Sequence, residues 1–223
     1  MVEGAKNVSE LLSSDFEILH LFVTEKFLQE YCNNLQIKIE YTLCSEKELI
    51  NLGSFQSNEY ALAVAKMRSD KSGLLDEKLI LALDEVQDPG NLGTIIRIAD
   101  WYGIKTIIAS HGTADVYNPK VINASMGSFT RVNIQYEDLG DFLKKNETYN
   151  VCGTFLNGKS VHDFIPVSPS IIIMGSESTG INHKLIPLID EKITIPGYGQ
   201  AESLNVAIST AIICDNFFRN LKN

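Results

Sequence analysis

Residues 88–97 read Asp88-Pro89-Gly90-Asn91-Leu92-Gly93-Thr94-Ile95-Ile96-Arg97. Polar residues and glycines thus lie where a buried strand is expected to end and a helix to begin. Two later segments, Gly175–Gly180 and Ile195–Asn205, show the same combination. Ligands of parallel α/β sheets bind outside the carboxyl ends of the strands, where loops of this kind gather. The three segments together therefore predict one composite site.

Length and composition set the first bounds. The chain has 223 residues, enough for one large domain or two modest ones, and 44% of them are hydrophobic. No run is apolar and long enough to span a bilayer, which takes about 20 residues, and no apolar region follows the first residues as it would in a signal peptide. The net charge of −9 argues against a general nucleic-acid binder, so any such site must be a local basic patch.

Cysteine and histidine usage predicts neither a metal site nor a disulfide framework. The cysteines lie far apart without a CxxC pair, which suits a reduced cytosolic setting; they are Cys32, Cys44, Cys152 and Cys214. The histidines lack metal-ligand spacing. The sequence has no GxSxG turn and no GxGxxG fingerprint, which disfavours a hydrolase and a dinucleotide-dependent oxidoreductase, and the Gly175 loop has no GxxxxGK[ST] pattern.

The chain is expected to contain two units. Residues 1–68 have the pattern of a small α/β unit, residues 69–75 of a polar linker, and residues 76–223 of a second α/β unit. In the first unit we expect strands at Ile18–Val23, Ile37–Tyr41 and Tyr60–Lys66, and helices at Val8–Leu12, Glu25–Asn33 and Glu46–Leu52.

Strands and helices alternate through residues 76–223. Several strand candidates are continuous apolar runs, as expected for strands covered on both faces, so the pattern predicts a parallel sheet. The expected strands are Leu79–Leu83, Thr106–Ala109, Arg131–Ile134, Tyr149–Thr154, Ser170–Met174 and Lys192–Ile195. The expected helices are Leu92–Tyr102, Pro119–Met126, Leu139–Lys145, Asn182–Ile189 and Ser203–Leu221. The last helix is apolar on more than one side, which indicates either deep burial or a second partner.

Each polar residue of the three segments can be interpreted either as a structural residue or as a functional one. Asn91 is placed as an N-cap, and Arg97 falls off the buried stripe of the helix that follows, so it is either a surface arginine or a site residue. Glu177 either favours a helix N-terminus or pairs with a nearby arginine. Ser203 is placed as an N-cap, and Asn205, expected inside the helix, needs partners for its amide, most commonly a crossing loop.

The order and content of these segments resemble the SpoU/TrmH class of the SPOUT superfamily, the knotted RNA ribose methyltransferases. Asn91-x-Gly93-x3-Arg97 resembles the first motif of that class, Gly175-Ser-Glu177-x2-Gly180 the second, and Ile195-Pro196 through Ser203-Leu204-Asn205 the third. The resemblance implies a C-terminal α/β knot with a trefoil-knotted parallel sheet and, in residues 1–68, an L30e-like substrate-binding domain.

The resemblance also implies roles for individual residues. It implies S-adenosylmethionine as cofactor, bound near Thr154, Gly175, Ile195 and Leu204. It implies methyl transfer to a ribose 2′-hydroxyl of rRNA or tRNA, with Arg97 positioning the hydroxyl, Glu177 orienting Arg97, and Asn91, Ser203 and Asn205 shaping the site. It further implies a homodimer that packs through the last helix. Independently of the resemblance, we expect the protein in the cytoplasm and a local basic patch for RNA at Lys6, Lys66, Arg68, Lys120 and Arg131.

The chain departs from the class at a few points. Ser178 stands where the second motif usually has glycine, and a basic residue common near Asn123 is missing. Members of the class usually carry a basic extension before the segment that begins at Val2 here, so the natural N-terminus is expected to be longer. The competing reading is a non-catalytic RNA-binding relative, which the presence of Asn91, Arg97, Glu177, Ser203 and Asn205 disfavours.

Overall fold

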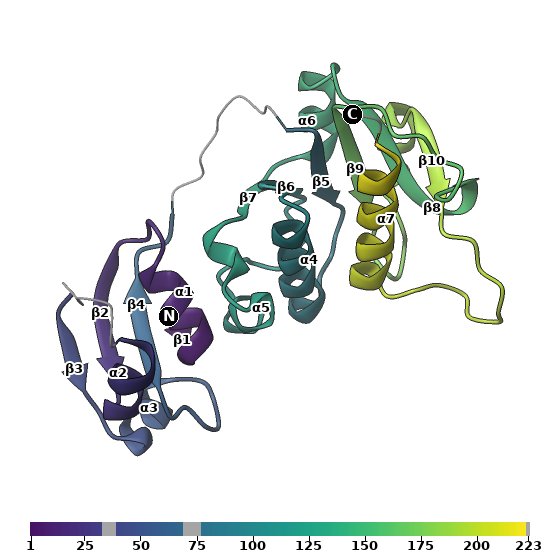
Figure 1. Ribbon diagram of the computed structural model, residues 1–223. Coiled ribbons are helices and arrows are strands. Elements are labelled where there is room, and N and C mark those ends of the chain that lie inside the picture. The colour runs from purple at the N-terminus through teal and green to yellow at the C-terminus, as the bar shows by residue number, and fades with distance from the viewer. Residues whose placement is uncertain (33–38, 69–76, 222–223) are drawn as a thin grey trace.

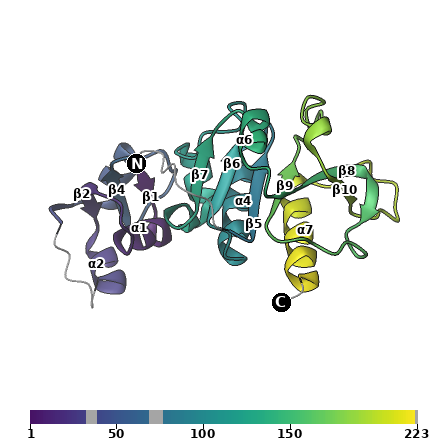
Figure 2. The ribbon, with the colours of Figure 1, turned by 90° about the horizontal axis from the view of Figure 1, so that it is seen from above.

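The computed structural model describes residues 1–32, 39–68 and 77–221, and they form two α/β units (Figure 1). The smaller, N-terminal unit lies beside the β7 edge of the large sheet of the other unit, away from β10 (Figure 1, Figure 2). The expected linker, residues 69–75, lies outside the described residues. In the described part of the chain no helix is long and apolar enough to cross a membrane.

The N-terminal unit has a four-stranded sheet in the order β1-β4-β2-β3, with β4 antiparallel to both β1 and β2. Its strands are β1 Val2–Glu3, β2 Ile18–Val23, β3 Tyr41–Leu43 and β4 Ala61–Ala65, and its helices are α1 Ala5–Leu12, α2 Glu25–Tyr31 and α3 Glu46–Leu52. The strand expected at Ile37–Tyr41 falls partly outside the described residues, and the described strand begins at Tyr41. The end of the helix expected at Glu25–Asn33 also falls outside them, and α2 ends at Tyr31.

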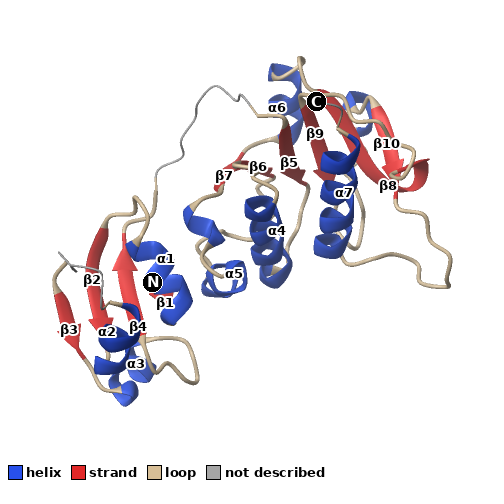
Figure 3. Cartoon of the chain, in the orientation of Figure 1, coloured by secondary structure: helices blue, strands red, loops and turns tan. Residues whose placement is uncertain are grey.

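The C-terminal unit is built on a six-stranded parallel sheet in the order β10-β8-β9-β5-β6-β7. Its strands are β5 Leu79–Leu83, β6 Thr106–Ala109, β7 Asn133–Tyr136, β8 Asn150–Ser160, β9 Ser170–Met174 and β10 Glu191–Thr194. Its helices are α4 Pro89–Trp101, α5 Pro119–Ser125, α6 Leu139–Lys145 and α7 Val206–Asn220, with short 3₁₀ helices η1 Ser128–Thr130 and η2 Ile186–Leu188 (Figure 3). The predicted parallel sheet is thus confirmed.

The central strands are buried on both faces, as their continuous apolar runs predict. In β5, Leu79, Leu81 and Leu83 face α4 and α7, whereas Ile80 and Ala82 face α6. The order of strands reverses at β5: the chain goes from β5 through β6 to β7, then returns past β5 to form β8, and β9 fills the place between β8 and β5. Ligands bind at the carboxyl ends of strands beside such a switch point.

Several expected elements differ from the structure, and β8 runs six residues beyond its expected end, to Ser160. The helix expected at Asn182–Ile189 is wrong, because only the 3₁₀ turn η2 forms there. The side chain of Asn182 accepts a hydrogen bond from the backbone of Lys184 (3.1 Å), and Pro187 cannot donate to a helix, so the chain turns instead. The strand expected at Arg131–Ile134 begins two residues later, at Asn133, because the backbone nitrogens of Arg131 and Val132 still bond the carbonyl of Ser128 in the turn that follows η1 (3.0 and 3.1 Å).

Candidate active site

The loop after β5 is anchored by the start of α4. Asp88 caps this helix, since its Oδ1 accepts a hydrogen bond from the backbone nitrogen of Asn91 (2.8 Å). Asn91 was expected to be the N-cap, and that expectation is wrong: Pro89 occupies the first helical position, where its missing N–H costs nothing, so Asn91 is the third helical residue. Its side chain is thereby available to other loops.

Three side chains from the three loops form one hydrogen-bond network. The Nδ2 atom of Asn91 donates to Oε1 of Glu177 (2.9 Å). The Nδ2 atom of Asn205 donates both to Oδ1 of Asn91 (2.9 Å) and to Oε1 of Glu177 (3.0 Å). Residues far apart in the sequence therefore meet at the carboxyl ends of the strands, and the expectation of one composite site holds for its polar centre.

Asn205 also explains how α7 begins. It is the N-cap of this helix, with Oδ1 accepting from the backbone nitrogens of Ala207 (2.9 Å) and Ile208 (3.3 Å). The expectations that Ser203 caps the helix and that Asn205 lies inside it are therefore wrong. Because the oxygen of Asn205 is held by α7, its amide nitrogen must face the other two loops, and this in turn orients the amide of Asn91.

Arg97 does not join this network. It is exposed on α4, about 9 Å along the helix axis from Asn91 at 1.5 Å per residue, and the two residues lie on different faces of the helix. Within the described residues Arg97 makes no ion pair, and Glu177 bonds Asn91 and Asn205 instead. The expectation that Glu177 orients Arg97 is therefore wrong for the single chain. The neighbour of Arg97 one turn further on is Trp101, which is 84% exposed.

The loop after β9 is closed by two glycines. Ser176 and Gly180 form a short antiparallel bridge, and Gly180 has a φ of +69°, a conformation that favours glycine. A Cβ atom on Gly175 would lie 2.4 Å from the carbonyl carbon of Gly180, so only glycine fits there. The buried carboxylate of Asp84, at the end of β5, accepts from the backbone nitrogen of Asn182 (2.6 Å) and holds the far end of this loop. Burial raises the pKa of Asp84.

The residues expected to bind the cofactor lie in or beside the same loops but differ in their contacts and exposure. The Thr154 hydroxyl donates to the carbonyl of Ile173 on the neighbouring strand (2.9 Å), which ties β8 to β9. Ile195 is partly buried against the core, whereas Leu204 is 46% exposed and Tyr198 is 93% exposed. The segment between β10 and α7 extends away from the sheet (Figure 1). Leu204 and Tyr198 in this segment are therefore exposed rather than packed against the core.

The sequence of the C-terminal unit matches a known family. A profile of the SpoU rRNA Methylase family matches residues 78–215, which contain all three loops of the network. The chain belongs to this family. It is similar to the 23S rRNA (guanosine(2553)-2′-O)-methyltransferase RlmP of Bacillus subtilis, with 32% identity over 96% of this chain and 86% of the relative.

Solved structures of the family resemble the whole chain. One is a putative RNA methyltransferase of the TrmH family from Porphyromonas gingivalis, with a TM-score of 0.85 and 35% identity over 98% of this chain and 89% of that one. Another is the SpoU methyltransferase AviRb from Streptomyces viridochromogenes in complex with AdoMet, with a TM-score of 0.85 and 25% identity over 98% of this chain and 88% of that one. Both likenesses extend over the N-terminal unit as well as the family region.

The basic residues expected to contact RNA are mostly paired within the chain. The pairs are Lys6 with Glu10, Lys66 with Glu17 (2.6 Å), Arg68 with Asp15, and Arg131 with Glu10 and Asp100 (2.8 Å to Asp100). Lys120 makes no ion pair among the described residues. Exposed pairs of this kind contribute about 0–1 kcal/mol to the stability of the fold.

Arg131 has a structural role that the sequence did not indicate. It connects α1 of the N-terminal unit, through Glu10, with α4 of the C-terminal unit, through Asp100. Burial opposes the ionisation of Asp100, but hydrogen bonds from Arg131 and Ser128 outweigh it and lower the pKa of that carboxyl. Hydrogen bonds from Lys6 and Arg131 likewise lower the pKa of Glu10. Arg131 therefore joins the two units.

Burial raises the pKa of each of the four thiols in the described residues. No group of His, Cys, Asp or Glu there is arranged to hold a metal ion. The four cysteines are free. Burial raises the pKa of Cys152 and of Cys214 to about 12, so both thiols stay protonated at neutral pH and are poor nucleophiles.

Proposed function

We propose that the protein transfers a methyl group from S-adenosylmethionine to a ribose 2′-hydroxyl of structured RNA, either rRNA or tRNA, in the cytoplasm. The observation that carries the proposal is the hydrogen-bond network of Asn91, Glu177 and Asn205, because it joins the three loops that resemble the motifs of the family. The names of the relatives support it, since the Bacillus protein is named as a 2′-O-methyltransferase of 23S rRNA.

The loops suit S-adenosylmethionine, a ligand with an apolar ring and several polar groups. Exposed Leu204 and Tyr198 can cover an aromatic ring, and a Cβ atom at Gly197 or Gly199 would meet nothing within 4 Å, so the backbone there is open to a ligand. When bound, the cofactor supplies a methyl group on a positively charged sulfur, so the protein needs mainly to align the nucleophile. Thr154, Gly175 and Ile195 would line the loops that hold it.

Arg97 is proposed to position the ribose rather than to remove its proton. The pKa of a guanidinium is above about 12, so the side chain stays charged and acts as a donor at neutral pH. From its exposed place on α4 it can hold the 2′-oxygen or the adjacent phosphate. Asn91, Glu177 and Asn205 would fix the loops relative to one another, and Ser203 would shape the loop beneath the cofactor.

We also propose the finer architecture that the family resemblance implies. Residues 1–68 would be an L30e-like domain that binds the RNA, residues 69–75 a linker, and residues 76–223 a methyltransferase domain with a trefoil knot. Two observations support the knot: β9 lies between β8 and β5, and α7 returns to pack beside α4. The stacked rings of Tyr102 and Phe218, with centroids 5.5 Å apart, join these two helices.

The protein is proposed to be a homodimer that packs through α7. The structure reduces the apolar surface expected for this role, because Phe217 is buried in the monomer and Phe218 stacks on Tyr102. Ile208 is still 55% exposed, at the start of α7 beside the network.

An Ile212→Glu substitution should give monomers, as measured by light scattering, and should lower the activity. Circular dichroism checks that the variant is folded. Full activity of a wild-type monomer at micromolar concentration would refute the dimer.

Cofactor binding provides the first test of the function. S-adenosylhomocysteine should raise the melting temperature, since a ligand that binds only the folded state stabilises it, while NAD should not. Arg97→Ala should keep this shift, because Arg97 is exposed and lies away from the three loops. A wild-type protein that shows no shift at millimolar S-adenosylhomocysteine, but binds RNA, would be a non-catalytic RNA-binding relative instead.

A further inference from the structure

The carboxylate of Glu177 uses only one of its two oxygens in the network. Its Oε1 atom accepts from the side-chain amides of Asn91 (2.9 Å) and Asn205 (3.0 Å), and from the backbone nitrogen of Val206 (3.4 Å). Its Oε2 atom makes no hydrogen bond or ion pair within residues 1–32, 39–68 and 77–221. An ionised carboxylate accepts at both oxygens, so one acceptor is left open where the three loops meet.

The donors to Oε1 hold this carboxylate in one orientation. They come from the first turn of α4 and from the start of α7, so two helices fix the side chain of Glu177. The positive end of the α7 dipole also favours a negative charge at this point. Because the side chain of Glu177 is exposed, a substrate at the loops can reach Oε2.

The other polar side chains of these loops are less suited to accept a proton. The hydroxyls of Ser176 and Thr179 bond each other (2.8 Å). Asp88 is held by a single donor, the backbone nitrogen of Asn91 (2.8 Å), as the cap of α4. Glu202 makes no hydrogen bond or ion pair in the described part of the chain, so nothing fixes its carboxylate. Glu177 is therefore the carboxylate that the loops orient best.

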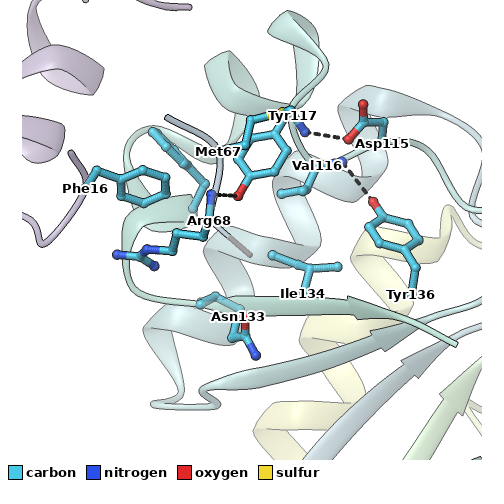
Figure 4. Close-up of a pocket in the computed structure, with 11 residues that line it drawn as sticks. Phe16, Met67, Arg68, Asp115, Val116, Tyr117, Asn133, Ile134 and Tyr136 are labelled. Atoms are coloured by element: carbon cyan, nitrogen blue, oxygen red, sulfur yellow. Dashed lines mark hydrogen bonds between the residues drawn. The ribbon is translucent and has the colours of Figure 1, made fainter. Parts of the chain in front are cut away.

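A cavity of about 310 Å³ lies at the junction of the two units, beside β7 (Figure 4). The groups of Arg68 in its lining already have partners. The backbone nitrogen donates to the hydroxyl of Tyr117 (3.0 Å), and the guanidinium lies over the ring of Phe16 and pairs with Asp15. Unlike Oε2 of Glu177, these groups are not open to a ligand.

We propose that Oε2 of Glu177 accepts the proton of the ribose 2′-hydroxyl during methyl transfer, an inference that rests on the proposed function. A guanidinium has no acceptor, so Arg97 cannot take this proton. As the 2′-oxygen bonds to the methyl carbon, the bond from that carbon to sulfur breaks with its electron pair on sulfur, and the hydroxyl proton passes to Oε2. The protonated carboxyl then returns the proton to water. Arg97 is left to hold the adjacent phosphate.

The Glu177→Gln substitution separates this role from a structural one. Glutamine keeps an oxygen for the two amides but places an N–H donor where Oε2 was. The variant should keep the melting shift with S-adenosylhomocysteine, the affinity for RNA and KM. Its kcat should fall about 10²–10⁴-fold, the usual contribution of a positioned proton acceptor. Glu202→Gln makes the same change of charge in the loop after β10 and is the control, with kcat unchanged.

Binding to an unreactive RNA gives a readout that does not depend on activity. With S-adenosylhomocysteine present, filter binding compares a 23S rRNA or tRNA transcript with the same transcript carrying 2′-deoxyribose at the methylated nucleotide. Loss of a hydrogen bond to a charged acceptor should weaken binding to the wild type about 10- to 150-fold. Glu177→Gln offers only a neutral partner, so its loss should be about 2- to 10-fold. Any effect of the altered sugar on the shape of the RNA is the same for both proteins.

Several results would overturn the assignment. They are wild-type kcat in Glu177→Gln, or equal losses of affinity for the two proteins on the deoxyribose transcript. If Glu177→Gln loses the melting shift together with its activity, Glu177 acts only by holding the loops. If Asp88→Asn or Glu202→Gln loses kcat and Glu177→Gln does not, the acceptor is that other residue. Failure of the proposed function is recognised separately, because the wild type itself would then transfer no methyl group to either transcript.

Discussion

The side chain of Asn205 has two structural roles, and different substitutions can separate them. Its oxygen caps α7, and its nitrogen donates to Asn91 and Glu177. The Asn205→Ala substitution removes both roles, whereas Asn205→Ser keeps an oxygen that can cap the helix but loses the amide donor. Loss of a cap costs about 1 kcal/mol. Each of the two exposed amide bonds is worth about 0.5 kcal/mol, at the low end for hydrogen bonds, since water can replace it.

The expected destabilisation is therefore about 2 kcal/mol for Asn205→Ala and about 1 kcal/mol for Asn205→Ser. A chain of this length loses roughly 2–4 °C of melting temperature per kcal/mol, so calorimetry should resolve the two variants. Both should lose most methyl-transfer activity, because both release the loop after β10 from the other two. The cap alone then cannot support activity.

A double-mutant cycle tests the same reasoning without reference to activity. The Asn91→Ala substitution should be less costly in the Asn205→Ser background than in the wild type, with a coupling of about 0.5 kcal/mol or more between the two side chains. Equal melting temperatures for Asn205→Ala and Asn205→Ser would show that the cap contributes nothing. Full additivity of Asn91→Ala and Asn205→Ser would show that the two amides do not interact, and the account of the network would fail.

Three further outcomes are expected. Burial raises the pKa of Asp84, so the wild type loses stability as pH rises through that pKa. The melting temperature of Asp84→Asn should therefore be higher than that of the wild type at pH 7, and the two should differ little at pH 3. Glu10 and Asp100 have lowered pKa values, and their stabilisation is lost as pH falls below about 4, so Arg131→Met should lower the melting temperature at pH 7 but hardly at pH 3. Trp101, the single tryptophan, lies on α4 beside the proposed dimer helix, so its fluorescence should shift to longer wavelength when the protein is diluted to monomers; a constant spectrum would contradict that interface.

The sequence predicted the architecture of the C-terminal unit well. The boundaries of β5, β6, β9 and α6 agree with the expected ones, because each is a compact run bounded by polar or turn residues. The prediction failed where side chains compete with the backbone for hydrogen bonds. Asn182 bonds to the backbone of Lys184 and so replaces an expected helix with a turn.

Three of the residues singled out in the sequence lie in one hydrogen-bond network, but the sequence did not predict how they bond. Asn91, Glu177 and Asn205 were singled out, yet the sequence could not show that Asp88 rather than Asn91 caps α4, since both are good capping residues three positions apart. The family resemblance implied that Glu177 orients Arg97, whereas in the structure Glu177 accepts hydrogen bonds from two amides. Arg131 was assigned to RNA for its charge alone, because its partners Glu10 and Asp100 are remote in the sequence.

The central claim is methyl transfer to a ribose hydroxyl, and one measurement tests it directly. The protein is incubated with S-adenosylmethionine carrying a tritiated methyl group and with unmodified 23S rRNA or tRNA transcripts, and the RNA is then hydrolysed with alkali. A 2′-O-methylated ribose blocks cleavage of its phosphodiester, so the account predicts label in alkali-resistant dinucleotides for the wild type and none for Arg97→Ala. Label in mononucleotides, or equal label with both proteins, would contradict it.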